Sequence, residues 1–72
     1  MKIMTITLNG KKQEIGENLT ISQFLESLNL HPRRVAVEVN RVIIKRDEFE
    51  RHPLREGDEI EVLQFVGGGA RL

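Results

Sequence analysis

A single amphipathic helix between strand-forming segments is the feature that most limits the folds open to this chain. Apolar residues recur there at helical spacing: Ile21, Phe24, Leu25 and Leu28. Thr20 and Gln23 have the spacing of a capping box, and Pro32 prevents the helix from continuing. We therefore expect one helix over residues 20–28. Because one helix covers only one side of a sheet, the other side of the sheet is expected to be exposed.

The segments on both sides of this helix have the composition of β-strands. The expected strands are residues 2–8, 11–15, 35–39, 41–44 and 58–65. Asn9-Gly10 predicts a tight hairpin turn, because both residues tolerate positive φ, and Gly57 predicts a second turn before the last strand. The charged segment 45–55 is expected to be irregular, with Phe49 and Leu54 inserted into the core.

This order of elements, β-β-α-β-β-β, predicts an α+β fold. One helix should pack on one face of a mixed sheet of four to five strands, with the first and last strands central and parallel. That is the ubiquitin-like β-grasp arrangement. We expect residues 1–66 to form this domain and residues 67–72 to form a flexible, glycine-rich C-terminal tail, because three consecutive glycines lose the most backbone entropy on ordering.

Composition excludes several kinds of function. With 72 residues the chain has room for one small core, and without cysteine it has no disulfide and no thiolate. The net charge of zero argues against a nucleic-acid or membrane-surface partner, and the sequence has no apolar run of membrane-spanning length. We therefore expect a cytoplasmic protein. His31 and His52 have no ligand or catalytic partner at a suitable spacing, so no metal site and no catalytic residue are predicted.

Five segments carry a resemblance to a known family. They are Leu8-Asn9-Gly10, Leu19-Thr20-Ile21, Val37-Glu38-Val39-Asn40, Leu54-Arg55-Glu56-Gly57-Asp58-Glu59-Ile60-Glu61 and Phe65-Val66-Gly67-Gly68-Gly69. The early segments are typical of many β-grasp proteins, whereas the acidic last strand that leads into glycines is more specific. Over essentially its whole length the chain resembles the ThiS family, the sulfur carriers of thiamine biosynthesis.

The resemblance implies a chemistry for the tail. In that family the last glycine is adenylated by an E1-like adenylyltransferase that uses ATP, and a persulfide-forming sulfur donor then converts it to a thiocarboxylate for thiazole synthase. The corresponding residue here is Gly69, and Gly67 and Gly68 would thread the tail into the partner. The protein would be a carrier and co-substrate, not an enzyme, and would hold no cofactor of its own.

The chain departs from the family pattern after the glycines. Family members usually end there, but this sequence continues with Ala70-Arg71-Leu72, so Gly69 lies in an internal peptide and has no free carboxylate. The resemblance therefore implies either that a protease removes the last three residues or that the chain is inactive as a carrier. We expect the trimmed form to be the active one.

Residue parity in the last strand predicts a docking surface beside the tail. If Ile60 and Val62 face the helix, then Leu63 and Phe65 face away from it, and together with Val66 they form an exposed apolar patch. Nearby acidic residues are expected to be a solvated strand face, and they could also steer a basic partner. These residues are Glu56, Asp58, Glu59 and Glu61.

Three other functions fit the same residues. The small subunit of molybdopterin synthase has the same fold and tail chemistry with a different acceptor. A ubiquitin-like modifier would transfer its activated glycine to a lysine. A non-covalent β-grasp interaction domain would not need the glycines at all.

Overall fold

The computed structural model describes residues 2–65, and the expected tail 67–72 lies outside them. The elements are β1 (Ile3–Leu8), β2 (Lys11–Gly16), α1 (Ile21–Ser27), η1 (Pro32–Arg34), β3 (Val35–Val39), β4 (Val42–Ile44), η2 (Arg46–Glu48) and β5 (Glu59–Gln64). The five strands form one sheet in the order β2-β1-β5-β3-β4. Only β1 and β5 are parallel, and the other neighbours are antiparallel. The predicted β-grasp architecture is confirmed.

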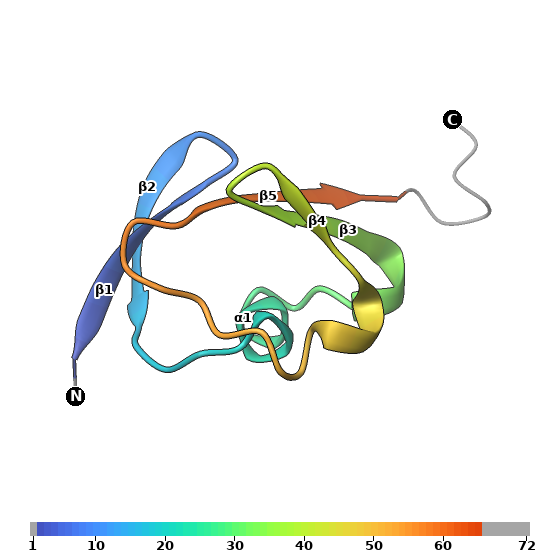
Figure 1. Cartoon of the computed structure of the whole chain (residues 1–72), viewed down its shortest axis with the longest axis horizontal. Helices are drawn as coiled ribbons and strands as arrows, with labels where there is room; N and C mark the ends of the chain where they lie inside the picture. Colours follow the sequence, from blue (N-terminus) through green and yellow to red (C-terminus); the bar gives the residue numbers. More distant parts are fainter. Residues whose placement is uncertain (1, 66–72) are drawn as a thin grey trace.

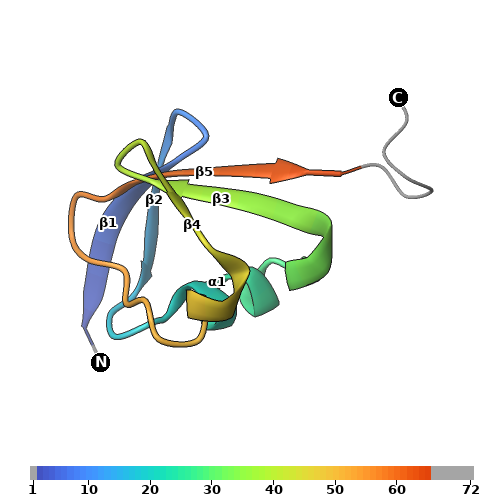
Figure 2. The same ribbon diagram turned by 45° about the vertical axis from the view of Figure 1, so that its right-hand side comes forward.

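Helix α1 lies across one face of the curved sheet (Figure 1 and Figure 2). Its start is fixed by the predicted capping box: the Gln23 backbone N–H donates to Thr20 Oγ1 at 3.2 Å, and the Thr20 N–H donates to Gln23 Oε1 at 2.9 Å. These two bonds satisfy N–H groups that have no partner inside the helix. The helix ends where Asn29 takes the left-handed conformation, with φ +62°.

The core lies between α1 and the sheet. The buried apolar residues are Met4, Ile6, Ile21, Phe24, Leu25, Val35, Val37, Val39, Phe49, Leu54 and Ile60. Phe49 and Leu54 come from the long connection between β4 and β5 and are buried in the core, as predicted. Every strand except β2 and β4 therefore supplies a fully buried side chain to one continuous cluster.

Both tight hairpin turns use two residues with positive φ. Asn9 and Gly10 join β1 to β2 with φ of +49° and +85°, and Asn40 and Arg41 join β3 to β4 with φ of +53° and +71°. The expectation that Arg41 begins the fourth strand was wrong. Val39 pairs directly with Val42, so Asn40 and Arg41 are the two residues of the turn. Two-residue turns with positive φ are favoured here because their twist matches the right-handed twist of the strands that they join. Within the charged segment that was expected to be irregular, residues Arg46–Glu48 form the 3₁₀ turn η2.

Candidate functional site

Strand β5 is the element that carries the candidate site, because it lies at the centre of the sheet and leads toward the glycines. It pairs with β3 from Ile60 to Gln64 and with β1 only at Glu59 and Ile60. In Figure 1 its end lies far from β1 and β2, so the last described residues emerge at one edge of the molecule. The candidate site is therefore the face of β5 that α1 does not cover.

Leu63 and Phe65 are exposed on β5 and directly after it. Leu63 is 65% exposed, and Phe65 is 39% exposed, whereas Ile60 is buried against the helix side. The Phe65 N–H donates to the Arg34 carbonyl at 2.7 Å, so the backbone remains held at the end of the strand. The predicted outward placement of Leu63 and Phe65 is confirmed. Val66 and the glycines at 67–69 lie outside the described residues, and the docking role stays a prediction.

Asn9 holds β5 where β1 has ended. Its N–H donates to the Ile60 carbonyl, its Oδ1 accepts from the Val62 N–H at 2.9 Å, and its Nδ2 donates to the Val62 carbonyl at 3.2 Å. The side-chain amide thus pairs with Val62 as a neighbouring strand would. This contact fixes the direction of β5 beyond its short parallel pairing with β1. Sequence reasoning gave Asn9 only a turn role, because nothing local indicates a partner so distant in the chain.

Asn40 and Asp58 join the β3–β4 turn to the start of β5. Asn40 Nδ2 donates to Asp58 Oδ1 at 3.0 Å, Asn40 Oδ1 accepts from the Glu59 N–H at 2.9 Å, and Asp58 Oδ2 accepts from the Arg55 N–H at 2.9 Å. Asp58 is only 9% exposed. The expectation that Asp58 belongs to a solvated acidic face was wrong: its carboxylate caps the turn before β5, because the Arg55 N–H in that turn needs an acceptor.

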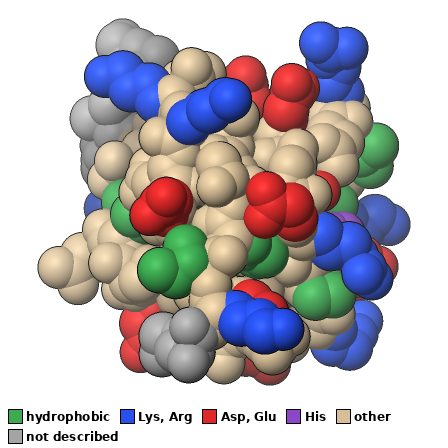
Figure 3. Space-filling view, turned by 90° about the vertical axis from the view of Figure 1, so that its left-hand side faces the viewer, with side chains coloured by type: hydrophobic (Ala, Val, Ile, Leu, Met, Phe, Trp, Pro, Cys, Tyr) green, Lys and Arg blue, Asp and Glu red, His purple; other side chains and the backbone are tan. Residues whose placement is uncertain are grey.

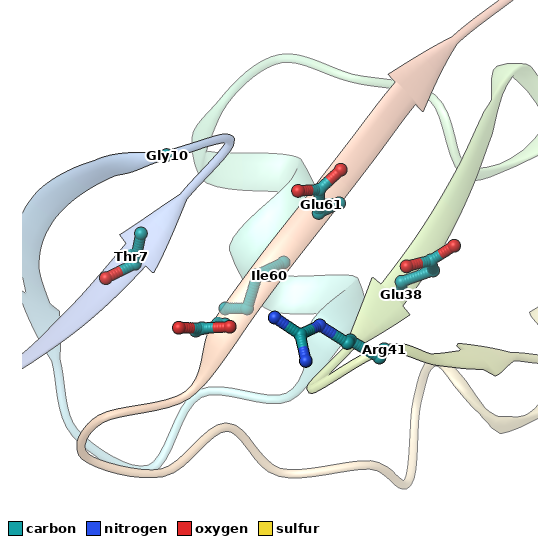
Figure 4. Close-up of a pocket in the computed structure, with 7 residues that line it drawn as sticks. Thr7, Gly10, Glu38, Arg41, Ile60 and Glu61 are labelled. Carbon is teal, nitrogen blue, oxygen red and sulfur yellow. The ribbon is translucent and has the colours of Figure 1, made fainter.

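The remaining acidic residues form a different arrangement on the exposed face. Glu38 of β3 and Glu61 of β5 are direct cross-strand partners, and Figure 4 shows their side chains projecting from neighbouring strands, with the Arg41 side chain extending toward β5. These residues, with Thr7, Gly10, Glu59 and Ile60, line one open depression. Glu56 is used elsewhere, since its Oε1 accepts from the Thr5 N–H at 3.0 Å.

The side of the molecule nearest β1 and β2 differs from the exposed face of β5. Figure 3 shows the side of the molecule nearest β1 and β2, where acidic and basic side chains are mixed. His31 Nδ1 accepts from the Arg33 N–H at 3.1 Å, which is a local turn contact. Within residues 2–65 no group of three or more His, Cys, Asp or Glu side chains could hold a metal ion. None of the described helices is long and apolar enough to cross a bilayer.

One helix on a mixed five-stranded sheet, with the parallel pair at its centre, defines a β-grasp protein. The chain belongs to the ThiS family, whose sequence model matches residues 3–69. The match runs through the whole described domain and ends at the last of the three glycines.

Individual relatives agree with this assignment. The chain is 38% identical over 68 residues to the sulfur carrier protein ThiS of Bacillus subtilis, which covers 89% of this chain and 98% of that protein. It is also 38% identical over 66 residues to a thiazole synthase of Magnetococcus marinus, which covers 92% of this chain. The chain spans about a fifth of the length of the thiazole synthases that it matches.

A solved structure supports the fold independently. The crystal structure of the thiamine biosynthesis protein ThiS of Geobacter metallireducens superposes with a TM-score of 0.79 at 33% identity, and the alignment covers 92% of this chain and all of that one. The predicted fold and the predicted family are both confirmed.

Truncating Phe65 tests the docking surface. Phe65→Ala is expected to weaken partner binding about tenfold or more, because exposed aromatic side chains at a contact are typical binding hot spots. The melting temperature should fall much less than after a core substitution, since 39% of the side chain is already exposed and the backbone bond to Arg34 remains. Calorimetric titration and thermal denaturation measure the two effects. A large loss of stability with unchanged binding would show that Phe65 is structural.

Proposed function

We propose that this chain is a sulfur carrier of thiamine biosynthesis, acting through a thiocarboxylate at Gly69. The observation that carries the proposal is the family match, which extends past the folded domain and ends at Gly69. The similarity to proteins named sulfur carrier protein ThiS supports the carrier role. The similarity to thiazole synthases supports thiazole synthase as the acceptor of the sulfur.

The chemistry follows from the weakness of a carboxylate as an electrophile. An E1-like adenylyltransferase would join the Gly69 carboxylate to the α-phosphate of ATP and release pyrophosphate. A persulfide would then attack the acyl carbon and expel AMP. A second thiol would cleave the resulting S–S bond and leave the thiocarboxylate on Gly69. This chain supplies only the carboxylate and a surface for docking, so it is a co-substrate, and the bound ATP belongs to the partner.

The folded domain and the tail have separate tasks in this proposal. The exposed face of β5, with Leu63 and Phe65, would dock the partner, and Val66 would extend that contact. Gly67 and Gly68 would pass through a channel too narrow for side chains, because a residue without Cβ can approach other groups most closely. Residues 1–66 thus act as the docking domain and residues 67–72 as the reactive tail, after a protease has removed Ala70-Arg71-Leu72.

An intact-mass spectrum of the protein from its native cell tests this proposal directly. The expected species ends at Gly69 and includes a form in which one oxygen has been replaced by sulfur. A population that consists only of the untrimmed, unmodified chain under thiamine starvation would contradict the proposal. Covalent conjugates with other proteins would instead indicate the ubiquitin-like modifier.

Two further experiments test the remaining alternatives, the molybdopterin synthase subunit and the non-covalent interaction domain. A pull-down that recovers a molybdopterin synthase large subunit in place of thiazole synthase would assign the chain to that pathway. Full activity of a chain truncated after Val66 would exclude the three functions that need the glycines and would leave only the non-covalent interaction domain.

A further inference from the structure

The exposed face of the sheet contains a groove whose lining is both apolar and acidic. It has a volume of about 460 Å³ and is formed where β3, β4 and β5 lie side by side. Ala36, Ile43 and Leu63 supply its exposed apolar surface, and Glu38 and Glu61 supply carboxylates. Ile43 and Leu63 are 71% and 65% exposed, which is unusual for large apolar side chains on an ordered sheet. An exposed groove of this kind marks a contact with another molecule.

The register of the strands places the two carboxylates directly opposite each other. Glu38 pairs with Glu61 across β3 and β5, and Glu38 also pairs with Ile43 across β3 and β4. Side chains in such pairs have Cβ atoms about 4.5–5.5 Å apart, and like charges at this distance destabilise a sheet. Among residues 2–65 the side-chain hydrogen bonds involve neither carboxylate. Arg41 is the one basic residue that lines the depression with Glu38, Glu59 and Glu61, so it offsets only part of their charge.

We infer that this groove receives a partner surface that presents an arginine or lysine to the Glu38–Glu61 pair and an apolar side chain to Ile43 and Leu63. The inference rests on the proposed function, and it specifies the chemistry of the adenylyltransferase surface that docks there. A cation between the two carboxylates removes their repulsion and gains two charge-assisted bonds. Because this contact lies on β5 upstream of the tail, it fixes the direction in which the tail enters the partner.

A second copy of this chain is a poorer occupant of the groove. A two-fold dimer brings the same surface patch of both copies into one interface. A dimer through this face would therefore contain the Glu38–Glu61 pair of both copies. Four carboxylates would then lose water without a cation to compensate them. A partner with the opposite charge fits the groove better.

Neutralising either glutamate should weaken partner binding without lowering the stability of the free protein. Using the full chain and the E1-like adenylyltransferase, Glu38→Gln and Glu61→Gln should each weaken binding about tenfold, measured by calorimetric titration at low salt. The same variants should keep or raise the melting temperature, because each removes the part of the cross-strand repulsion that Arg41 does not offset. The matched control is Glu26→Gln on the opposite side of the molecule, where Glu26 is an exposed residue of α1, and binding should not change.

The outcomes separate this inference from the proposed function. If the unaltered chain binds and both glutamine variants bind equally well, the groove inference is wrong while the carrier assignment stands. A lower melting temperature in the variants would also overturn it, since the carboxylates would then be structural. Failure of the unaltered chain to bind would contradict the proposed partner and the inference together. Self-association of the free chain that Glu38→Gln abolishes would assign the groove to a second copy.

Discussion

Phe24→Ala is expected to unfold a large fraction of the protein. Phe24 is 1% exposed and lies in the middle of α1, where it packs against the sheet. Removing a buried phenyl ring costs ~3–5 kcal/mol, because the apolar transfer energy is lost and a cavity remains. Small domains have total stabilities of about 5–15 kcal/mol, and a chain this short lies toward the lower end of that range. Urea denaturation of the variant should show a strongly lowered midpoint.

Phe65→Ala is the matched control for this substitution. It removes the same atoms from a side chain that is 39% exposed, so its effect on unfolding should be about 1–2 kcal/mol, clearly smaller than that of Phe24→Ala. Comparable losses in the two variants would mean that burial of the helix face does not account for the stability of the fold.

The chain ending at Leu72 is expected to be inert toward the E1-like adenylyltransferase, whereas a chain ending at Gly69 should react. The reason is covalent: in the longer chain Gly69 is joined to Ala70 by a peptide bond and offers no carboxylate to ATP. Pyrophosphate exchange with the same enzyme preparation measures the difference. Equal exchange by both chains would refute the need for trimming, and exchange by neither would count against the sulfur-carrier assignment itself.

A substitution within the shorter chain separates docking from reaction. Gly68→Ala adds a Cβ that restricts the backbone and meets the walls of a narrow channel, which displaces the carboxylate. A misplacement of about 1 Å can reduce a rate about a hundredfold. Binding should remain nearly normal, because it depends on the folded domain. Weak binding with a normal rate for the bound form would place the tail in the docking contact instead.

Local sequence patterns were sufficient to predict the architecture. The capping box at Thr20 and Gln23, the apolar stripe of α1 and the turn at Asn9-Gly10 each depend on residues a few positions apart, and all three occur in the structure. With one helix and five short strands, few topologies satisfy the rules for right-handed and short connections. The outward placement of Leu63 and Phe65 followed from the two-residue period of a strand.

Long-range side-chain contacts were beyond such reasoning. The bonds of Asn9 to Val62 join residues 53 positions apart, and those of Asn40 and Asp58 join two loops that meet only in the folded state. Asp58 lies among acidic residues that are exposed, so composition alone indicated a solvated position. The cross-strand pairing of Glu38 with Glu61 likewise required the register of β3 against β5, which single-strand patterns do not determine.

The position of β5 has a consequence for the order of events during synthesis. This strand follows the other four in the sequence, yet it lies between β1 and β3, so the two halves of the sheet cannot join until the residues up to Gln64 have been synthesised. Pairings between such distant segments close slowly, since a long loop must be ordered first. The residues that lead into the glycines are the same ones that complete the sheet. A copy in which β5 has not paired therefore lacks the proposed docking face, so presentation of the glycines on that face depends on completion of the sheet.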